Sequence, residues 1–366
     1  MKRTSKGPAR SMLIHLVGGF LGSGKTTAIV EACRLLMRRG ITVGVVTNDQ
    51  GKNLVDTAFV RAAGAAAAEV SGGCFCCNLP DFERRLAELE EAAAPQVVFA
   101  EPVGSCTDLV ATIARPLARR GAAGWAMGSL TVVTDIRLLR RRLHDEPLPF
   151  SSEVIYIFDT QLDEAELIIV NKSDLVPAER AEEVLGLAAA RFPGKRVILQ
   201  NSRDPQSVER WLGLIGGGVH PLAGSAAVDY DRYAAGEMRL AWYDASVVVQ
   251  AEDGAAAVRI LMEELRAASR DAGGPAAHIK LLVEHRDGVF KGSLTDAEAA
   301  LPDVPAIAGP RMKVVVNARA ETHAEDLRSA MRAALERAAP RGGMEVRVTE
   351  EQSFHPFRPV PSERIP

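Results

Sequence analysis

The stretch GFLGSGKT at Gly19–Thr26 fits the pattern G-x-x-x-x-G-K-[ST] and decides the fold class of this chain. The apolar run Met12–Val17 before it predicts a strand, and the residues after it predict a helix over Thr26–Arg39. In that setting glycines let backbone N–H groups wrap a phosphate, and the helix start adds a positive dipole end. We expect Lys25 to reach the β- and γ-phosphates and the Thr26 hydroxyl to bind Mg²⁺. The other residues of this predicted phosphate site are Gly19, Gly22, Ser23, Gly24 and Thr27.

Short apolar runs alternate with helical patterns as far as Leu199. Further strands are predicted at Thr42–Thr47, Gln96–Ala100, Ser129–Thr134, Leu167–Val170 and Arg196–Leu199, and further helices at Pro80–Ala93, Ser105–Arg120 and Pro177–Arg191. Most of these strands are apolar along their length, as strands covered on both faces are. The alternation predicts an α/β P-loop NTPase fold with a mostly parallel sheet wrapped by helices.

The order of predicted helices and strands changes in the second part of the chain. A length of 366 residues is also typical of two domains. Strands are predicted at Leu240–Gln250, Lys313–Asn317 and Met344–Val348, helices at Ala255–Ala272 and Ala324–Ala338, and a hairpin at His278–His285 and Gly288–Ser293. This order suggests a smaller C-terminal α+β domain of the ferredoxin-like kind. The expected organisation is a disordered leader at 1–10, a GTPase domain at 11–215, a linker at 216–236, the α+β domain at 237–350 and an extended tail at 351–366.

Composition excludes several classes of protein. The net charge is −3, from 44 basic and 47 acidic residues mixed along the chain, so neither nucleic acid nor a membrane surface is an expected partner. No apolar stretch approaches the length of a transmembrane helix. The five cysteines are not a disulfide framework, because their number is odd and three of them fall within four positions. We therefore expect a cytoplasmic protein, in a compartment that keeps thiols reduced.

A polar segment with the sequence NKSD, Asn171–Asp174, directly follows a predicted strand. The Asp174 carboxylate can accept both the ring N–H and the exocyclic amine of guanine, and adenine lacks this pair of donors. We expect Asn171 to hold the phosphate loop and approach the base, and the Lys172 stem to pack on the ring. Ser202 is expected to offer a backbone N–H to the same base. The predicted ligand is therefore GTP or GDP.

Glu101 and Gly104 follow another predicted strand and belong to the expected hydrolytic end. A carboxylate there can hold Mg²⁺ or orient the attacking water, and Gly104 would give an N–H close to the γ-phosphate. Lys25, Glu101 and Gly104 are the predicted catalytic residues. Asp49 and Asp56 lie where a first switch loop is expected. Either can join the Mg²⁺ shell, with Asp49 the predicted ligand, or both can be solvated loop acids.

Three thiols, Cys74, Cys76 and Cys77, follow two glycines and precede a predicted helix. Thiols at this spacing can hold one soft or borderline ion, and Zn²⁺, Cu(I), Co²⁺ and Ni²⁺ all remain open. The alternative interpretation is that these three cysteines are buried apolar residues of the core. Cys106 lies two residues beyond Gly104, and it would supply a fourth sulfur if the thiols lie over the switch region. The alternative for Cys106 is a core position at a helix start.

These motifs together resemble the CobW-type group of P-loop GTPases, over about the first 215 residues. The resemblance rests on Gly19–Thr26, Cys74-x-Cys76-Cys77, Glu101-x-x-Gly104 and Asn171-Lys-x-Asp174 in that order. It implies a slow GTPase that inserts metal for zinc, cobalt or nickel enzymes, with the cysteines as metal ligands. One departure concerns Asn48–Lys52, where many members carry Asn-Glu-Phe-Gly-Glu and this chain has NDQGK. The seven histidines are scattered, which argues against a high-capacity zinc store.

The leading interpretation is a GTP-hydrolysing metallochaperone that serves a client metalloenzyme or a cofactor-assembly protein through its C-terminal domain. One alternative is a GTPase that gates the loading of a cofactor such as a corrinoid without carrying metal. Two others are a phosphotransferase acting on a small substrate and a nucleotide-binding module without turnover. The sequence leaves open the metal, the client and the oligomeric state, including a homodimer.

Overall fold

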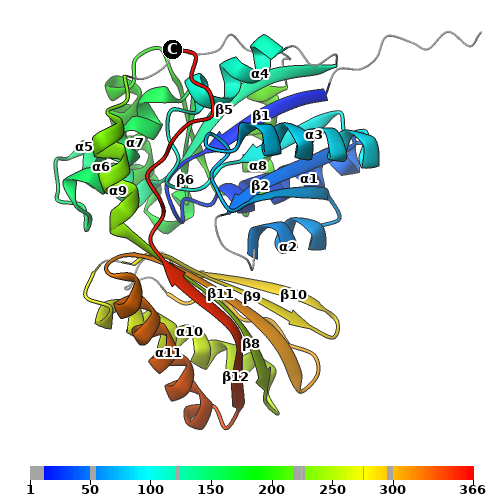
Figure 1. The fold of residues 1–366 in the computed structure, drawn as a ribbon, viewed down its shortest axis with the longest axis vertical. Helices are drawn as coiled ribbons and strands as arrows, with labels where there is room; N and C mark the ends of the chain where they lie inside the picture. The colour runs from blue at the N-terminus through cyan, green and yellow to red at the C-terminus, as the bar shows by residue number, and fades with distance from the viewer. Residues whose placement is uncertain are drawn as a thin grey trace, which may run out of the picture.

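The computed structural model describes residues 12–49, 55–120, 124–216, 224, 227–274, 276–294 and 300–366. The expected leader at 1–10 and residues 217–223 and 225–226 of the expected linker lie outside these described residues. Two sheets organise the described chain, one above the other in Figure 1, and they come from consecutive parts of the sequence. Along the described residues, no helix has the length and apolarity needed to cross a membrane.

The first sheet has seven strands within the described residues, in the order β3-β2-β4-β1-β5-β6-β7, and their pairings are parallel. The predicted P-loop NTPase class is thereby confirmed. Since the strands are parallel, their carboxyl ends share one edge, where loops can build a site. The strands are β1 (Met12–Gly18), β2 (Val43–Asp49), β3 (Ala66–Ser71), β4 (Val97–Glu101), β5 (Trp125–Asp135), β6 (Leu167–Asn171) and β7 (Arg196–Gln200).

Helices cover both faces of this sheet (Figure 1). They are α1 (Lys25–Arg38), α2 (Val55–Ala62), α3 (Leu79–Ala93), the π-helix η1 (Val110–Ala114) with α4 (Arg115–Arg120), α5 (Ile136–Leu143), α6 (Ser152–Glu164), the 3₁₀ turn η2 (Ser173–Leu175), α7 (Ala178–Arg191) and α8 (Pro205–Ile215). The prediction of a helix from Ser105 was wrong at its start, because η1 begins only at Val110. Asp108 has a φ of 64°, which an α-helix cannot contain.

The second sheet is antiparallel, with the order β10-β9-β11-β8-β12 among the described residues. Without the edge strand β10, the order β9-β11-β8-β12 is that of the split β-α-β fold, as the ferredoxin-like prediction expected. Helices α10 and α11 pack together on its outer face (Figure 1). The elements are α9 (Tyr230–Arg239), β8 (Leu240–Gln250), α10 (Gly254–Asp271), β9 (Ala276–His285), β10 (Gly288–Leu294), β11 (Arg311–Glu321), α11 (Ala324–Arg341) and β12 (Glu345–Phe354). Helix α9 falls partly within 216–236, where we expected a linker.

The inner face of the second sheet packs against helix α2 of the first part. Val55 at the start of α2 forms a small apolar cluster with Leu282 of β9 and Val315 of β11, and Phe59 packs against it. This contact brings β9 and β10 to the carboxyl edge of the parallel sheet. The last residues, 355–366, form neither helix nor strand and run back along the first part of the molecule, in red in Figure 1.

Candidate nucleotide and metal sites

The loop between β1 and α1 has the conformation that a phosphate cradle needs. Gly19 and Gly24 have φ angles of 129° and 98°, which favour glycine. A Cβ on Gly19 would lie 2.0 Å from the Val133 carbonyl oxygen, so a side chain has no room there. Lys25 Nζ folds back over the loop and donates to Gly19 O at 2.8 Å. Burial lowers the pKa of Lys25 to about 8, against the opposing effect of the nearby Glu101 carboxylate.

Three oxygen atoms meet at the start of α1. Thr26 Oγ1 lies 2.9 Å from Glu101 Oε1, at the end of β4, and 3.0 Å from Asp56 Oδ1, on α2. Glu101 Oε2 is buried and has no hydrogen-bond partner among the described residues. Burial raises the pKa of Glu101, and the Asp56 charge adds to this effect. A hydroxyl, two carboxylates and an unsatisfied buried oxygen fit the oxygen ligands that Mg²⁺ takes. Asp49, the predicted ligand, ends β2, and its side chain lies outside the described residues.

Two lysines of the second sheet reach this cluster. Lys291 Nζ of β10 lies 2.9 Å from Asp56 Oδ1, and Lys280 of β9 contacts Asp56 Oδ2. Burial alone would raise the pKa of Asp56, but the two ammonium groups outweigh it and hold that pKa well below its usual range. No pattern in the sequence predicts this contact. The alternation of polar and apolar residues around His278 and Lys280 predicts a two-faced strand, and does not say what the polar face meets.

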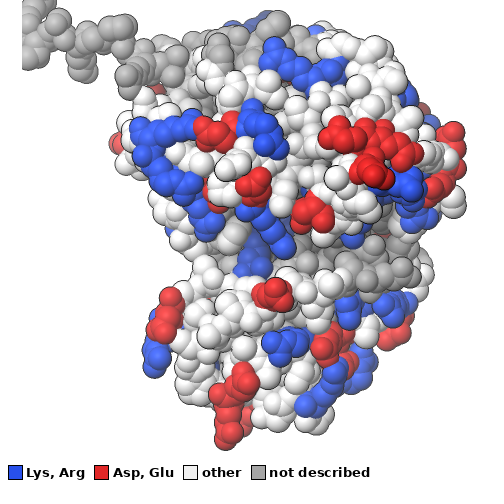
Figure 2. Space-filling model, turned by 180° about the vertical axis from the view of Figure 1, so that it is seen from behind, with Lys and Arg blue, Asp and Glu red and all other residues white. Residues whose placement is uncertain are grey.

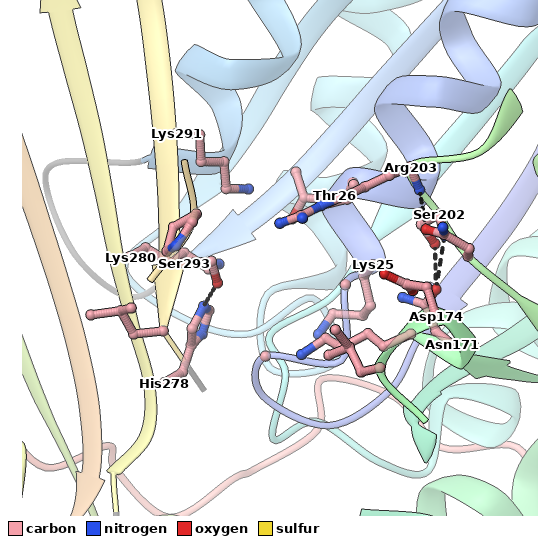
Figure 3. Close-up of a pocket in the computed structure, with 18 of the residues that line it drawn as sticks. Lys25, Thr26, Asn171, Asp174, Ser202, Arg203, His278, Lys280, Lys291 and Ser293 are labelled. Atoms are coloured by element: carbon pink, nitrogen blue, oxygen red, sulfur yellow. Dashed lines mark hydrogen bonds between the residues drawn. The ribbon is translucent and has the colours of Figure 1, made fainter. Parts of the chain in front are cut away.

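One cavity of about 460 Å³ runs along these groups and holds most of the predicted nucleotide residues. Figure 3 shows its two sides, with Lys25, Thr26 and Asn171 facing Lys280 and Lys291 of the second sheet. Lys and Arg side chains lie at the narrow waist between the two parts in Figure 2. The predicted residues that line the cavity are Gly22, Gly24, Lys25, Thr26, Thr27, Glu101, Asn171, Lys172, Asp174 and Ser202, and those that the sequence analysis missed include Arg137, His278, Lys280, Lys291 and Ser293.

The far end of the cavity is built around Asn171. Its Nδ2 donates to Ser23 O at 2.7 Å, which ties the end of β6 to the phosphate loop, as expected. The Ser202 N–H and hydroxyl both donate to Asn171 Oδ1, at 3.1 and 2.8 Å. The backbone N–H that we expected at the base is therefore engaged by Asn171 here. Asp174 is exposed and lines the cavity beside Leu175.

Lys172 joins this end to a buried acid that the sequence analysis did not single out. It has a left-handed φ of 62°, and its Nζ lies 2.9 Å from Asp135 Oδ2 at the end of β5. Asp135 also accepts from the backbone N and guanidinium of Arg137. Burial opposes ionisation of Asp135, yet Arg137 and Lys172 together lower its pKa to about 2. The aliphatic stem of Lys172 is thus held along the cavity by its terminal ion pair.

The loop after β4 lies against the phosphate loop. A Cβ on Gly104 would come within 2.8 Å of the Leu21 side chain and 3.1 Å of the Leu21 backbone nitrogen. Gln161 Nε2 donates to the carbonyls of Gly104 and Cys106, at 3.1 and 2.8 Å. A small cavity of about 40 Å³ is lined by Gly104 together with Glu101, Asp56 and Lys280. The predicted catalytic residues Lys25, Glu101 and Gly104 therefore all line this small cavity.

The three clustered thiols lie together, away from the nucleotide cavity. Cys74 Sγ is 2.8 Å from Cys76 Sγ and 2.9 Å from Cys77 Sγ, and the latter two are 3.8 Å apart. The Sγ atoms of Cys74, Cys76 and Cys77 all lie within 4.8 Å of one another, and the Cys106 thiol lies beside Cys74 and Cys76 without joining that set. Hydrogen bonds from Cys106, Cys76 and Cys77 lower the pKa of Cys74 well below its usual range. Cys33 packs in a different apolar cluster.

Asn48, at the end of β2, holds the thiol loop in place. Its Nδ2 donates to Gly73 O at 2.7 Å and to Val70 O at 3.0 Å, and its Oδ1 accepts from the Phe75 N–H at 2.9 Å. Cys74, Cys76 and Cys106 are buried, while Cys77 is only partly buried. Val360 of the C-terminal segment approaches the Cys77 thiol, with its backbone N 3.3 Å from Cys77 Sγ. The cluster is therefore reached from the side of Cys77.

Comparison with known proteins identifies the family of this chain. Residues 13–200 match the model of the CobW/HypB/UreG nucleotide-binding domain, which is about half of the chain. The chain belongs to this family. The range that matches the CobW/HypB/UreG domain includes the phosphate loop, the cysteines, Glu101 and Asp174, whereas Ser202 and the five-stranded sheet lie beyond it.

Two curated relatives are named zinc chaperones. The chain is 27% identical over 223 residues to zinc chaperone CobW of Sinorhizobium sp, covering 54% of this chain and 61% of that protein. It is 30% identical over 214 residues to zinc chaperone YeiR of Escherichia coli strain K12, covering 56% of each. The chain thus spans less than two thirds of the length of these relatives.

Two solved structures are similar to parts of this chain. HypB from Helicobacter pylori in complex with nickel matches with 18% identity and a TM-score of 0.40, over 56% of this chain and 86% of that chain. The Zn(II)-bound YjiA GTPase from E. coli matches with 15% identity and a TM-score of 0.39, over 88% of this chain and 99% of that chain.

Proposed function

We propose that this chain is a GTP-hydrolysing metallochaperone that carries a transition metal on Cys74, Cys76 and Cys77, with Cys106 as a fourth sulfur in one nucleotide state, and delivers it to a client protein. The observation that carries the proposal is the short loop from Glu101 to Cys106. Its first residue contacts Thr26 in the phosphate site, and its last residue interacts with the clustered thiols. One segment therefore touches both the site of hydrolysis and the site of the metal.

Guanine is the proposed base because Asp174 lines the cavity at the end where Asn171 braces the phosphate loop. The triphosphate would lie along the loop of Gly19–Thr26, where Lys25 supplies a positive charge. Thr26, Glu101 and Asp56 would hold Mg²⁺, which, when bound, neutralises charge on the β- and γ-phosphates.

Hydrolysis would proceed by attack of water on the γ-phosphorus, with cleavage of the bond to the β–γ bridging oxygen. Glu101 is the residue that would orient the water, and the Gly104 N–H would donate to the γ-phosphate. The products are GDP and inorganic phosphate. Loss of the γ-phosphate removes the acceptor of the Gly104 N–H, so the loop that ends at Cys106 can relax. We infer that this movement weakens the fourth thiolate contact and releases the metal.

Zinc is the proposed cargo, since thiolates suit Zn²⁺ and the similar curated relatives are named zinc chaperones. A tetrahedral site with Zn–S bonds of about 2.3 Å has sulfurs about 3.8 Å apart. The Cys76–Cys77 separation is already 3.8 Å, whereas Cys74 lies 2.8 and 2.9 Å from its neighbours. Metal entry would thus move Cys74 outward by roughly 1 Å. Cobalt and nickel are the alternatives that the experiment distinguishes.

The test is a titration of Zn²⁺, Co²⁺ and Ni²⁺ into the full chain with GDP or a non-hydrolysable GTP analogue. We expect one ion per chain, thiolate-to-Co²⁺ absorption, and an affinity that depends on the nucleotide. The double variant Cys76→Ser, Cys77→Ser should lose the ion, and Cys106→Ser should lose the nucleotide dependence. Cys33→Ser, in a separate core, is the matched control. GTP turnover without bound metal in any state would favour the alternative GTPase that gates cofactor loading.

A further inference from the structure

The cation pair of the second sheet has no part in the function proposed above. Lys280 and Lys291 lie on adjacent strands of the hairpin β9–β10, and both contact Asp56 on α2. Their side chains are only 18% and 9% exposed, so the two ammonium groups are largely shielded from solvent, unlike ordinary surface lysines. Lys291 Nζ also lies 4.6 Å from the centre of the Phe59 ring on α2. The hairpin is therefore held against α2 by ion pairs with Asp56 and by a cation–π contact with Phe59.

The position of the two lysines points to the terminal phosphate. Both line the same cavity as Lys25, Thr26 and Glu101, at the end opposite Asp174 (Figure 3). Lys280 is close enough to Lys25 for its charge to lower the pKa of Lys25. The end of the cavity that would hold the γ-phosphate thus receives cations from both parts of the molecule.

Charge balance explains why these lysines would exchange partners. In the structure, Asp56 is the anion that compensates Lys280 and Lys291, and all three side chains are partly buried. Asp56 Oδ1 is also within 3.0 Å of Thr26 Oγ1, where Mg²⁺ is expected. A divalent cation and two ammonium groups cannot share one partly buried carboxylate without strong repulsion. The lysines then need another anion within reach, and the γ-phosphate oxygens would supply it.

We propose that Lys280 and Lys291 bind the γ-phosphate of GTP from the C-terminal sheet, so that this sheet distinguishes GTP from GDP. The inference rests on the proposed GTP binding and adds a second, interdomain set of phosphate ligands. GDP lacks the γ-phosphate and therefore offers Mg²⁺ one phosphate ligand fewer, so we expect Asp56 to stay with the lysines and not with Mg²⁺ when GDP is bound. The two nucleotides therefore stabilise different contacts between the hairpin and α2, which is the requirement for coupling between sites.

The test uses equilibrium binding of fluorescent GDP and of a fluorescent non-hydrolysable GTP analogue, with Mg²⁺ and without any transition metal. In Lys280→Met and Lys291→Met, affinity for the GTP analogue should fall roughly 10- to 100-fold, since a charged hydrogen bond is lost. Affinity for GDP should change less than about threefold. Each single variant keeps one lysine for Asp56, which preserves the fold, and Lys291→Arg should restore most of the affinity. Lys313→Met, an exposed lysine of β11, is the matched control.

A second readout reports the C-terminal sheet directly. Hydrogen exchange of β9 and β10 should be slower with the GTP analogue than with GDP in the unmutated chain, and equal with both nucleotides in the two methionine variants. An equal loss of affinity for both nucleotides, or no loss for either, would overturn the proposal. If the unmutated chain binds no guanine nucleotide, the proposed function itself fails. If the unmutated chain binds both nucleotides and the lysine variants bind them equally well, only the proposed role of the lysines fails.

Discussion

At the scale of single residues, the proposed choice of guanine depends on one carboxylate, Asp174, which lines the cavity. We predict that Asp174→Asn lowers GTP affinity by about a hundredfold or more, because the new amide can accept from only one of the two guanine N–H donors and turns its own N–H donor toward the other. The same change should raise affinity for xanthosine triphosphate, whose C2 oxygen accepts from the new amide. Competition binding with both nucleotides measures the exchange, and Lys313→Met serves as a control. Unchanged GTP affinity would remove Asp174 from the base site.

Gly24 is a second residue whose role can be tested alone. A Cβ on Gly24 would lie 2.4 Å from Asn171 Nδ2, and its φ of 98° is unfavourable for any other residue. Gly24→Ala should therefore displace Asn171 from Ser23 and lower GTP and GDP affinity together, roughly 10- to 100-fold, for a strain of about 1–3 kcal/mol. Gly186→Ala is the control, because nothing lies within 4 Å of a Cβ in that helix position. Equal nucleotide affinity in both variants would contradict the prediction.

The residues that the sequence predicted best belong to motifs in which a local pattern carries the chemistry. The phosphate loop and the NKSD segment are of this kind, since the strand before each motif sets its position. Lys280 and Asp56 are far apart in the sequence and meet only because α2 packs on the second sheet. The approach of Cys106 to Cys74 likewise depends on the loops after β4 and β3, which are separated in the sheet by β2. Such contacts follow from tertiary packing, which hydrophobic periodicity in the sequence does not predict.

At the scale of elements, the same distinction explains what was missed. Strand β3 begins with Ala66, Ala67 and Ala68, and alanine has a low β propensity, so no strand was predicted there. Its parallel pairing with β2 decides its conformation. The late start of the helix before α4 has a comparable cause. Glu164 of α6 accepts from the Leu109 N–H and the Thr107 hydroxyl, which holds the preceding residues in a loop.

Glu164 also makes this element sensitive to pH. Burial raises the pKa of Glu164 from its ordinary 4.5 to about 8. The folded chain therefore keeps a proton that the unfolded chain loses above pH 4.5, and this contribution to stability is lost as pH rises towards 8. Glu164→Gln keeps both contacts, because the Thr107 hydroxyl can accept from the new amide.

We predict that Glu164→Gln gains stability relative to the unmutated chain as pH rises from 5 to 8, by up to about 1.4 kcal/mol for each pH unit. Urea unfolding at a series of pH values measures this difference. Glu182→Gln, an exposed change on α7, should show no such trend. A constant difference between Glu164→Gln and the unmutated chain would show that Glu164 does not hold a proton in the fold.

At the scale of the whole molecule, the two sheets are joined by contacts at both proposed sites. The hairpin β9–β10 reaches the phosphate end of the cavity, and the C-terminal segment returns from β12 to the thiols (Figure 1). The sheet that contacts the phosphate site is thus continuous with the segment over the metal site. If the proposed function holds, hydrolysis at the phosphate end would be transmitted through the second sheet as well as through the loop from Glu101 to Cys106.

The C-terminal segment is fixed over the thiols by several hydrogen bonds. The Ser362 N–H donates to Cys76 O at 2.8 Å, and the Ser362 hydroxyl donates to Cys77 O at 2.6 Å. Arg364 Nε lies 2.7 Å from Oδ2 of the buried Asp108, which also accepts from the Tyr230 hydroxyl. An Arg paired with a buried carboxylate is costly to remove, so this anchor should hold the segment closed over Cys77.

We predict that a chain ending at Phe357 loses metal to a chelator several-fold faster than the full chain, while its affinity for GDP is unchanged. Arg364→Ala should show a smaller increase, because the Ser362 bonds remain. Arg358→Ala, which breaks only an exposed ion pair with Asp231, should leave the rate as it is. Labelling of Cys77 by a thiol reagent in the metal-free protein gives an independent measure of access. If truncation leaves both rates unaltered, metal leaves by a path that the C-terminal segment does not cover, and the loop ending at Cys106 alone governs release.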